Sequence, residues 1–488
     1  MNSPWSASRL SALAWAVLVL CGCGAVGPDY QRPVARLDDS FVSAGAQSTN
    51  AQAVPADIAE FWRRFDDAKL TALVERALAA NGDVRIAQAR LQEARANLDE
   101  ADAASRPGLG LDASATRAIR PITQQPGASR SARTGTTDDA SFIANWELDL
   151  FGRLRRGSEA AAAVVSANEA GLGAAHTAVA AEVARNYLEL RGLQQRVLFT
   201  EASLKNQRES LRITTARVDA GRGTQLDLVR AQGLVASTEA ALPALQASIE
   251  RSVFRLATLT AQSPRPLLAE LSSPAPLPAL PVTDLATLPV GTPEQWLRRR
   301  PDLIAAERQL AAATANIGVA RSELYPRLSL SGLLGLNAAS FSNLGKSESA
   351  RYSLGVGLTW TPFDLGAIRS RIRASEARAQ QSLANFEQTV ATALEETEGA
   401  FSSFTRNAQR AQKLDAAARS ADEAATLARL RYESGLTDFL AVLDAERESL
   451  NNRDQLVQAQ VSTASSLVTV YRALGGGWAS SVTQTAAR

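Results

Sequence analysis

The chain has 488 residues with 52 basic and 50 acidic side chains, few aromatic residues, one histidine and two cysteines. The balanced charge gives no argument for nucleic-acid binding, and the scarcity of His and Cys argues against catalysis or metal binding through those residues. The sequence contains no recognisable catalytic triad or phosphate-binding loop, so we expect no enzyme, no metal and no cofactor. The abundance of Ala, Leu, Gln, Arg and Glu favours long helices.

The chain begins with a pattern typical of a secretory leader. Arg9 precedes the apolar run 10–20, which is too short to cross a bilayer and has the length of the hydrophobic part of a signal peptide. The segment Leu20-Cys21-Gly22-Cys23 resembles the lipobox of bacterial lipoproteins. That resemblance implies removal of residues 1–22 and attachment of lipid, palmitate included, to Cys23. The alternative is a plain secretory signal with an incidental cysteine pair.

An internal repeat organises the rest of the chain. Residues 302–330 align without a gap on residues 83–111, and Pro326 then coincides with Pro107. We therefore expect two tandem repeats, each reading helix, strand, strand, long helix, long helix. The predicted divisions are a lipoprotein signal peptide (1–22), an extended lipidated arm (23–60), the first repeat (61–263), a Pro-rich linker (264–293), the second repeat (294–478) and a polar tail (479–488).

The first helices of the repeats are predicted to be short. Phe61 opens a helical region that Asn81-Gly82 ends as a C-cap. In the repeated stretch, small and apolar residues recur at alternating spacings of four and three, which indicates a narrow coiled-coil-like seam. Pro107 and Pro326 are predicted to stop the two equivalent helices and to form the joints between helix and strand.

After each proline the period of the apolar residues changes from 3.5 to 2. Two strands are predicted after each joint, each about as long as the 9–11 residues of a tilted transmembrane strand. Polar surface loops, 121–141 and 341–351, are predicted to connect them, and Trp146, Tyr352 and Trp360 lie where an interfacial aromatic girdle is expected. A small soluble sheet shows the same alternation and is the alternative. The predicted strands start at Leu109, Phe142, Leu328 and Tyr352.

Each pair of strands precedes two long helices. The first of each pair, at 1.5 Å per residue, is roughly 100 Å long. Pro243 is expected to interrupt and kink one of the others. The only histidine, His176, falls on an apolar heptad seam, so we expect it to be buried or at an interface rather than a ligand. The predicted helices are 154–218 and 225–261 in the first repeat, and 366–432 and 437–474 in the second.

Several segments, spread over almost the whole mature chain, carry a resemblance to one known family. They resemble the TolC-like outer-membrane factors, particularly the lipoprotein (NodT-like) branch found with RND-type efflux pumps. The matching segments are Cys23 to Pro33, Phe61-Trp62 with Phe65-Asp66-Asp67, Leu288 to Gly291, Arg299 to Asp302 with Ala306 to Leu310, and Leu474-Gly475-Gly476-Gly477-Trp478.

The resemblance implies an α+β membrane protein that forms a homotrimer. Each protomer would give four strands to a twelve-stranded outer-membrane β-barrel and long helices to a periplasmic α-helical barrel. The predicted strands independently require association if they lie in a membrane, because bacterial barrels start at eight strands and lipid tolerates no unpaired edge. Dimers and trimers both satisfy that requirement, and the family indicates three.

The function implied by the resemblance is passage rather than chemistry. The chain would be the outer-membrane exit duct of a tripartite efflux pump that exports small molecules. The implied partners are a periplasmic adaptor (membrane fusion) protein, an inner-membrane RND-type transporter and outer-membrane lipid, but no nucleic acid. The implied location is the cell outer membrane, with a lipid anchor and an extension into the periplasm. The alternatives are a type I protein secretion duct and a periplasmic coiled-coil lipoprotein without a pore.

The resemblance also implies a gate at the helix breaks near Gly221 and Gly435, which lie 214 residues apart. Family members carry acidic residues that ring this periplasmic tip, and Asp444 matches one such position. Ala441 at the other ring position, and Thr437 where some members carry a locking Arg, depart from the pattern. Three charged residues are candidates by proximity only, with a solvated helix-surface charge as the alternative for each: Asp227, Arg230 and Asp438.

Overall fold

The structure is a computed structural model that describes residues 24–34, 37–38, 40–43, 58–285 and 292–478. The predicted leader, Cys23 and the polar tail lie outside the described residues. The chain forms two compact units. The first contains residues up to 33, 91–168 and 306–386, and the second contains residues 34–90, 169–305 and those from 387 onwards. Both units therefore draw on both halves of the sequence.

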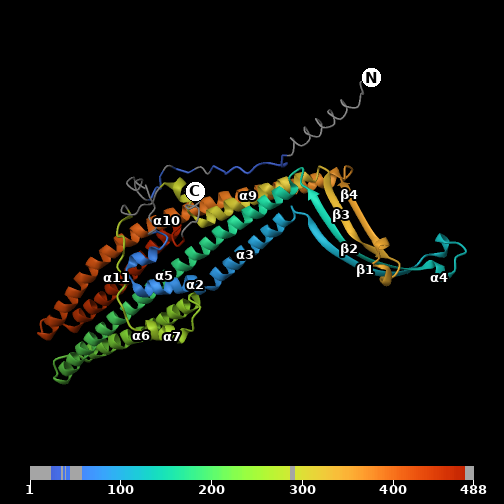
Figure 1. The fold of residues 1–488 in the computed structure, drawn as a ribbon. Coiled ribbons are helices and arrows are strands. Elements are labelled where there is room, and N and C mark those ends of the chain that lie inside the picture. Colours follow the sequence, from blue (N-terminus) through green and yellow to red (C-terminus); the bar gives the residue numbers. More distant parts are fainter. Residues whose placement is uncertain (1–23, 35–36, 39, 44–57, 286–291, 479–488) are drawn as a thin grey trace. The chain divides into compact units, whose positions relative to one another are not determined.

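The order of elements repeats along the chain (Figure 1). The first half contains η2 (Phe61–Phe65), α2 (Ala68–Ala80), α3 (Gly82–Ala103), β1 (Gly108–Ile119), η3 (Ile122–Gln124), α4 (Arg130–Arg133), β2 (Thr134–Leu148), α5 (Arg153–Asp219) and α6 (Gln225–Leu259). Helices α7 (Pro264–Leu271) and α8 (Pro293–Leu297) follow. The second half contains α9 (Pro301–Ser322), β3 (Arg327–Ala338), η5 (Phe341–Asn343), η6 (Ser347–Ser349), β4 (Ala350–Thr359), α10 (Leu365–Glu433) and α11 (Phe439–Ala473). This order confirms the predicted architecture of two tandem repeats.

The four strands form one antiparallel sheet in the order β1-β2-β3-β4. The prediction of a loop over residues 121–141 was wrong, because β2 begins at Thr134 and pairs with β1 from Ile119 onward. This part of the strand contains Thr, Gly and Asp and lacks the apolar alternation of a half-buried strand, so its backbone pairing left no signal in the sequence. The predicted loop 341–351 likewise ends at Ser349, where β4 follows.

The predicted ends of the four long helices agree with the observed ends to within two residues. Pro243 does not interrupt α6, which is continuous through it; the kink remains a prediction. The expected C-cap at Asn81-Gly82 was partly wrong. Asn81 ends α2 with an extended backbone, and Gly82 begins α3. The Asn81 side chain joins the ends of two helices, because its amide accepts from the Asp83 N–H at 2.8 Å and donates to the Leu259 carbonyl at 2.9 Å.

The core of the second unit explains two of the family-like motifs. Trp296 is fully buried and donates its indole N–H to the Ala473 carbonyl at 2.8 Å. The buried Arg300 forms ion pairs with Asp302 at 2.6 Å and with Glu396 at 3.0 Å. At Gly477, with φ +100°, an added Cβ would lie 2.8 Å from the Cα of Thr177. The glycines after α11 therefore allow the chain to approach the helices closely.

His176 is half-buried on α5, and burial lowers its pKa. This agrees with the expectation of a seam residue. Seam positions on α10 are also buried, as predicted: Phe386, Ala393, Thr397, Ala400 and Phe404.

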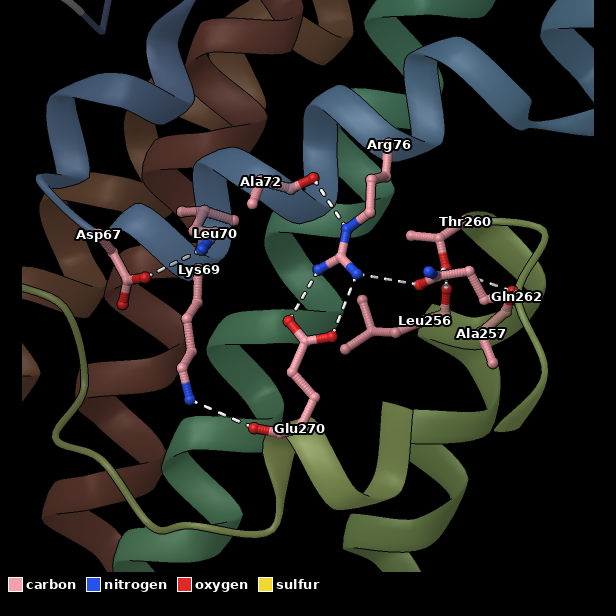
Figure 2. Close-up of polar contacts among 10 residues, drawn as sticks. All are labelled: Asp67, Lys69, Leu70, Ala72, Arg76, Leu256, Ala257, Thr260, Gln262 and Glu270. Carbon is pink, nitrogen blue, oxygen red and sulfur yellow. Dashed lines mark hydrogen bonds and ion pairs between the residues drawn. The ribbon is translucent and has the colours of Figure 1, made fainter. Parts of the chain in front are cut away.

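The Pro-rich linker begins with a helix. Helix α7 starts with Pro264, a residue suited to the first helical turn, and buries Leu267 and Leu271. Figure 2 shows how α7 is held to α2: Arg76 forms a two-pronged contact with the Glu270 carboxylate, at 2.9 and 3.1 Å. Lys69 donates to the Glu270 carbonyl at 3.2 Å.

Candidate functional site

One face of the sheet is apolar across all four strands. The register places Leu111, Phe142, Leu334 and Tyr352 in a single row, and neighbouring rows are also apolar. These side chains are exposed, Tyr352 at 85% and Leu109 at 82%. Exposed apolar patches of this extent mark interfaces with a membrane or a partner. Four further apolar rows on this face are Ala113, Ala140, Leu336 and Ala350; Leu109, Ala144, Gly332 and Leu354; Trp146, Leu330 and Val356; and Leu148, Leu328 and Leu358. The row beyond Ala113 contains Ala115, Asp138 and Ala338.

The opposite face of the sheet carries mainly small and polar residues, although one of its rows includes Ile143 and Leu333. One of its rows consists of Gly108, Asn145, Ser331 and Gly355. From Leu328 to Leu336 the apolar band extends about 26 Å along β3 at 3.3 Å per residue. The nine positions from Leu328 to Leu336 fall within the 9–11 residues of a tilted transmembrane strand. No described helix is long and apolar enough to cross a membrane.

Each junction between helix and strand contains a proline and a tryptophan. Pro107 lies between α3 and β1, and Pro326 lies between α9 and β3. The indole N–H of Trp146 donates to the Ser105 carbonyl at 2.9 Å. The equivalent Trp360 donates to the Leu324 carbonyl at 3.1 Å. Both indoles keep an exposed apolar ring with a satisfied polar group, the arrangement favoured at an interface between lipid and water.

The N-terminal arm of the first unit follows these junctions. The Val26 N–H donates to the Phe151 carbonyl at 3.0 Å. Gly27 meets Gly318 of α9 so closely that a Cβ on Gly27 would lie 2.5 Å from the Gly318 Cα. Further along the arm, Asp29 pairs with Arg156 at 2.6 Å. The described chain thus starts beside the helix-strand junction, while Cys23 itself lies outside the described residues.

The turns at Gly221 and Gly435 have the same backbone geometry. Gly221 has φ +71° and Gly435 has φ +75°. In the first turn, the N–H of Gly221 donates to the Val218 carbonyl and the N–H of Arg222 to the Arg217 carbonyl. The second turn repeats both bonds at Gly435 and Leu436. This is the Schellman motif, which satisfies the last carbonyls of a helix and favours glycine because of the left-handed conformation.

The next helices begin with side-chain caps that involve two of the predicted gate residues. Asp438 is the N-cap of α11 and accepts from the Ala441 N–H at 3.2 Å. Thr224 caps α6 and accepts from the Asp227 N–H, and its hydroxyl donates to the Asp227 carboxylate at 2.6 Å. Asp444 is exposed on α11, and Arg230 is partly exposed on α6. Asp227 takes part in the cap of α6, but within the described chain no two of the four predicted gate residues contact each other.

A contact that the sequence did not reveal joins the two turns. The guanidinium of Arg217 lies over the ring of Tyr432, 4.3 Å from its centroid, and also donates to the Tyr432 carbonyl. Tyr432 packs edge-on against Phe439, with ring centroids 5.6 Å apart. A small core of Ala231, Tyr432, Phe439 and Val442 surrounds this contact. We call the pair of Arg217 and Tyr432 the tip clasp.

A buried carboxylate lies further along α11. Glu446 is 5% exposed, and its Oε1 accepts from Ser210 at 3.1 Å and from Arg429 at 3.1 Å. Its Oε2 is buried without a hydrogen-bond partner. Burial raises the pKa of Glu446 despite the opposing effect of Arg429. Glu446 therefore links α5, α10 and α11 through a single oxygen. Within the described chain, no group of three or more His, Cys, Asp or Glu side chains is arranged to hold a metal ion.

Comparisons with known proteins agree with these features. A family model described as outer membrane efflux protein matches residues 73–262 and 292–476. The outer membrane protein OprJ of Pseudomonas aeruginosa is 34% identical over 95% of either chain. The solvent efflux pump outer membrane protein SrpC of Pseudomonas putida is 31% identical over 95% of this chain and 97% of its own. The structure of the outer-membrane channel OprN is similar with a TM-score of 0.85, at 41% identity over 93% of this chain and 99% of that chain.

The glycine at the tip can be tested with a matched pair of substitutions. Gly435→Ala places a Cβ in the left-handed region, which we expect to cost about 1–2 kcal/mol. Gly233→Ala, within α6 and with no atom within 4 Å of the added Cβ, should be neutral or stabilise by up to about 1 kcal/mol. Amide hydrogen exchange near residues 430–440 measures both. Equal protection in the two variants would contradict the structural role of Gly435.

The buried carboxylate predicts a specific pH dependence. A raised pKa means that folding favours protonated Glu446, so its contribution is fully present below the pKa of an unfolded glutamate, about 4.3. We expect that contribution to be lost as the pH rises through the raised pKa. Glu446→Gln removes this titration and should flatten the dependence. The measurement is the difference in thermal midpoint between wild type and variant from pH 4 to 8; a constant difference would refute the prediction.

Proposed function

Because the chain belongs to the outer membrane efflux protein family, we propose that it is the outer-membrane exit duct of a tripartite efflux pump for small molecules. The observation that carries this proposal is the apolar band across β1–β4. Its length along the strands fits tilted transmembrane strands, and the chain continues from the sheet into helices of 67 and 69 residues. Relatives whose names describe efflux, such as SrpC, support a role in an efflux pump rather than in type I protein secretion.

The proposed assembly is a homotrimer. In the sheet, β1 and β4 each have one strand partner, so two edges are open. A sheet in lipid must satisfy the backbone groups at such edges. Three copies would contribute twelve strands to one closed barrel and their long helices to a tunnel in the periplasm. A periplasmic adaptor protein and an inner-membrane RND-type transporter are the proposed partners at the helical end.

The proposed gate lies at the turns of Gly221 and Gly435. The tip clasp supports this assignment, because it ties α5 to the end of α10. Asp444 is proposed to face the passage and to favour cations, as an exposed acidic residue on the helix that follows the second turn. Asp227 and Asp438 are proposed to act there mainly by capping helices, and Arg230 remains a candidate by proximity.

The gate proposal is tested by ion passage. Purified wild-type protein in planar bilayers should form cation-selective channels, and Asp444→Asn should lower both the selectivity and the conductance. Glu423→Gln, which removes an exposed charge from α10, is the matched control and should behave as wild type. Wild-type protein that forms no channel would overturn the duct itself, whereas an unchanged Asp444→Asn channel would remove only this residue from the gate.

The anchor proposal is tested at Cys23. Cys23→Ser should abolish metabolic labelling with a fatty acid. The unlabelled protein should nevertheless remain a detergent-requiring trimer that dissociates on heating, because the apolar sheet would hold it in the membrane. Persistent labelling would contradict the assignment of Cys23. Release of the variant in soluble form would favour a periplasmic coiled-coil lipoprotein without a pore.

A further inference from the structure

The β1–β2 hairpin extends beyond the rest of the sheet. Pairing between β2 and β3 stops at Asp138 and Ala338, whereas β1 and β2 stay paired as far as Ile119 and Thr134. The four residues of β2 beyond Asp138, Thr137 to Thr134, carry the hairpin about 13 Å further at 3.3 Å per residue. The segment with η3 and α4 follows at the end of this extension (Figure 1).

This extension carries a concentrated positive charge. Arg117, Arg120, Arg130 and Arg133 lie in it, and no acidic residue occurs from Ala113 to Thr137. We call these four arginines the basic tip. None of them forms an ion pair with a carboxylate anywhere in the described chain. Within the described residues no ion pair neutralises their charge; Asp138, the nearest acidic residue along β2, lies two positions from Thr136, the strand partner of Arg117.

The second hairpin shows that the architecture does not require this charge. The pair of Leu109 and Ala144 in the first hairpin is equivalent to the pair of Leu328 and Leu358 in the second. The chain between the paired residues is five residues longer in the first hairpin than in the second. The connection of the second hairpin contains one lysine and one glutamate, Lys346 and Glu348. The basic tip is thus a specific addition to one repeat.

The turn holds two of the arginines together. The Arg120 N–H donates to the Arg133 carbonyl at 2.9 Å, and the Arg133 guanidinium donates to the Arg120 carbonyl at 2.9 Å. Ser129 caps the short helix between them by accepting from the Ala132 N–H at 3.2 Å. Like charges fixed at neighbouring positions repel each other, and a bound anion removes that cost.

The position of Arg117 identifies the anion. In the alternation of β1, Arg117 shares a face with Leu109, Leu111 and Ala113, so it follows the apolar band on the same side of the sheet. It lies six residues, about 20 Å, beyond Leu111. If lipid tails contact the apolar band, Arg117 lies at the level of the lipid headgroups. The negative groups of lipid headgroups are phosphates, which arginine binds through paired N–H donors.

We propose that the basic tip binds the phosphate groups of anionic lipid headgroups at the outward-facing surface of the outer membrane. The proposal rests on the proposed function, which puts the apolar band in lipid and the hairpin end outside. Arg117, Arg120 and Arg130 are exposed and contact the phosphates, and Arg133 mainly holds the turn. The contact fixes the height of the sheet in the membrane on the side away from the helices.

The test titrates purified detergent-solubilised trimer with diphosphoryl lipid A and follows the thermal midpoint. Wild type should be stabilised at lower lipid concentration than the variant Arg117→Gln/Arg120→Gln/Arg130→Gln. Each basic residue near an anionic surface contributes about fivefold in affinity, so we expect the apparent affinity of the variant to fall at least tenfold. The corresponding Arg→Lys variant keeps the charge and should lose much less.

Two further arms separate the possible sources of the effect. Lipid A without its phosphates should not distinguish wild type from the Gln variant. Inorganic phosphate at equal concentration should not reproduce the stabilisation; if it does, the tip binds a free ion and the lipid proposal is overturned. Equal binding of lipid A by wild type and Gln variant would also overturn it. Absence of trimers or channels in wild type would instead count against the proposed function, which the bilayer measurement detects separately.

Discussion

The open edges of the four-stranded sheet constrain everything else in this protein. Strands β1 and β4 each have an outer edge whose backbone groups have no strand partner among the described residues. Water can satisfy such groups but lipid cannot. One face of the same sheet carries an apolar band that favours contact with lipid. In lipid, a single protomer would leave the backbone groups at both sheet edges without hydrogen-bond partners. The trimer proposed here resolves both requirements, because each open edge finds a strand in the next copy.

The duplicated halves share the devices that build the architecture. Both use a proline before the strands and an indole bonded to the end of the preceding helix. Both end their long helices in a Schellman turn with a glycine in the left-handed region. These devices satisfy helix ends and turn the chain, so they recur wherever the fold needs them. These shared features define the fold, but they do not indicate a particular function.

The tip clasp and the basic tip, in contrast, lie at places where the two halves differ. Tyr432 and Phe439 of the second turn have Val218 and Gln225 at the equivalent positions of the first. The tip clasp can therefore form in one direction only, from Arg217 to the ring of Tyr432. The basic tip likewise occurs in one hairpin.

Periodicity in the sequence by itself determined the two repeats, the long helices and the presence of four strands, because helical and strand patterns depend on neighbouring residues. It also located the turns at Gly221 and Gly435, where glycine interrupts a regular pattern. It misjudged the start of β2 and the continuity of α6 at Pro243, since backbone pairing and helix packing override weak local signals. Only the tertiary structure decided that Arg217 reaches Tyr432 and that Glu446 is buried with one oxygen unpartnered. Those facts depend on residues more than 200 positions apart or on the direction of a side chain, which no local pattern of residue types specifies.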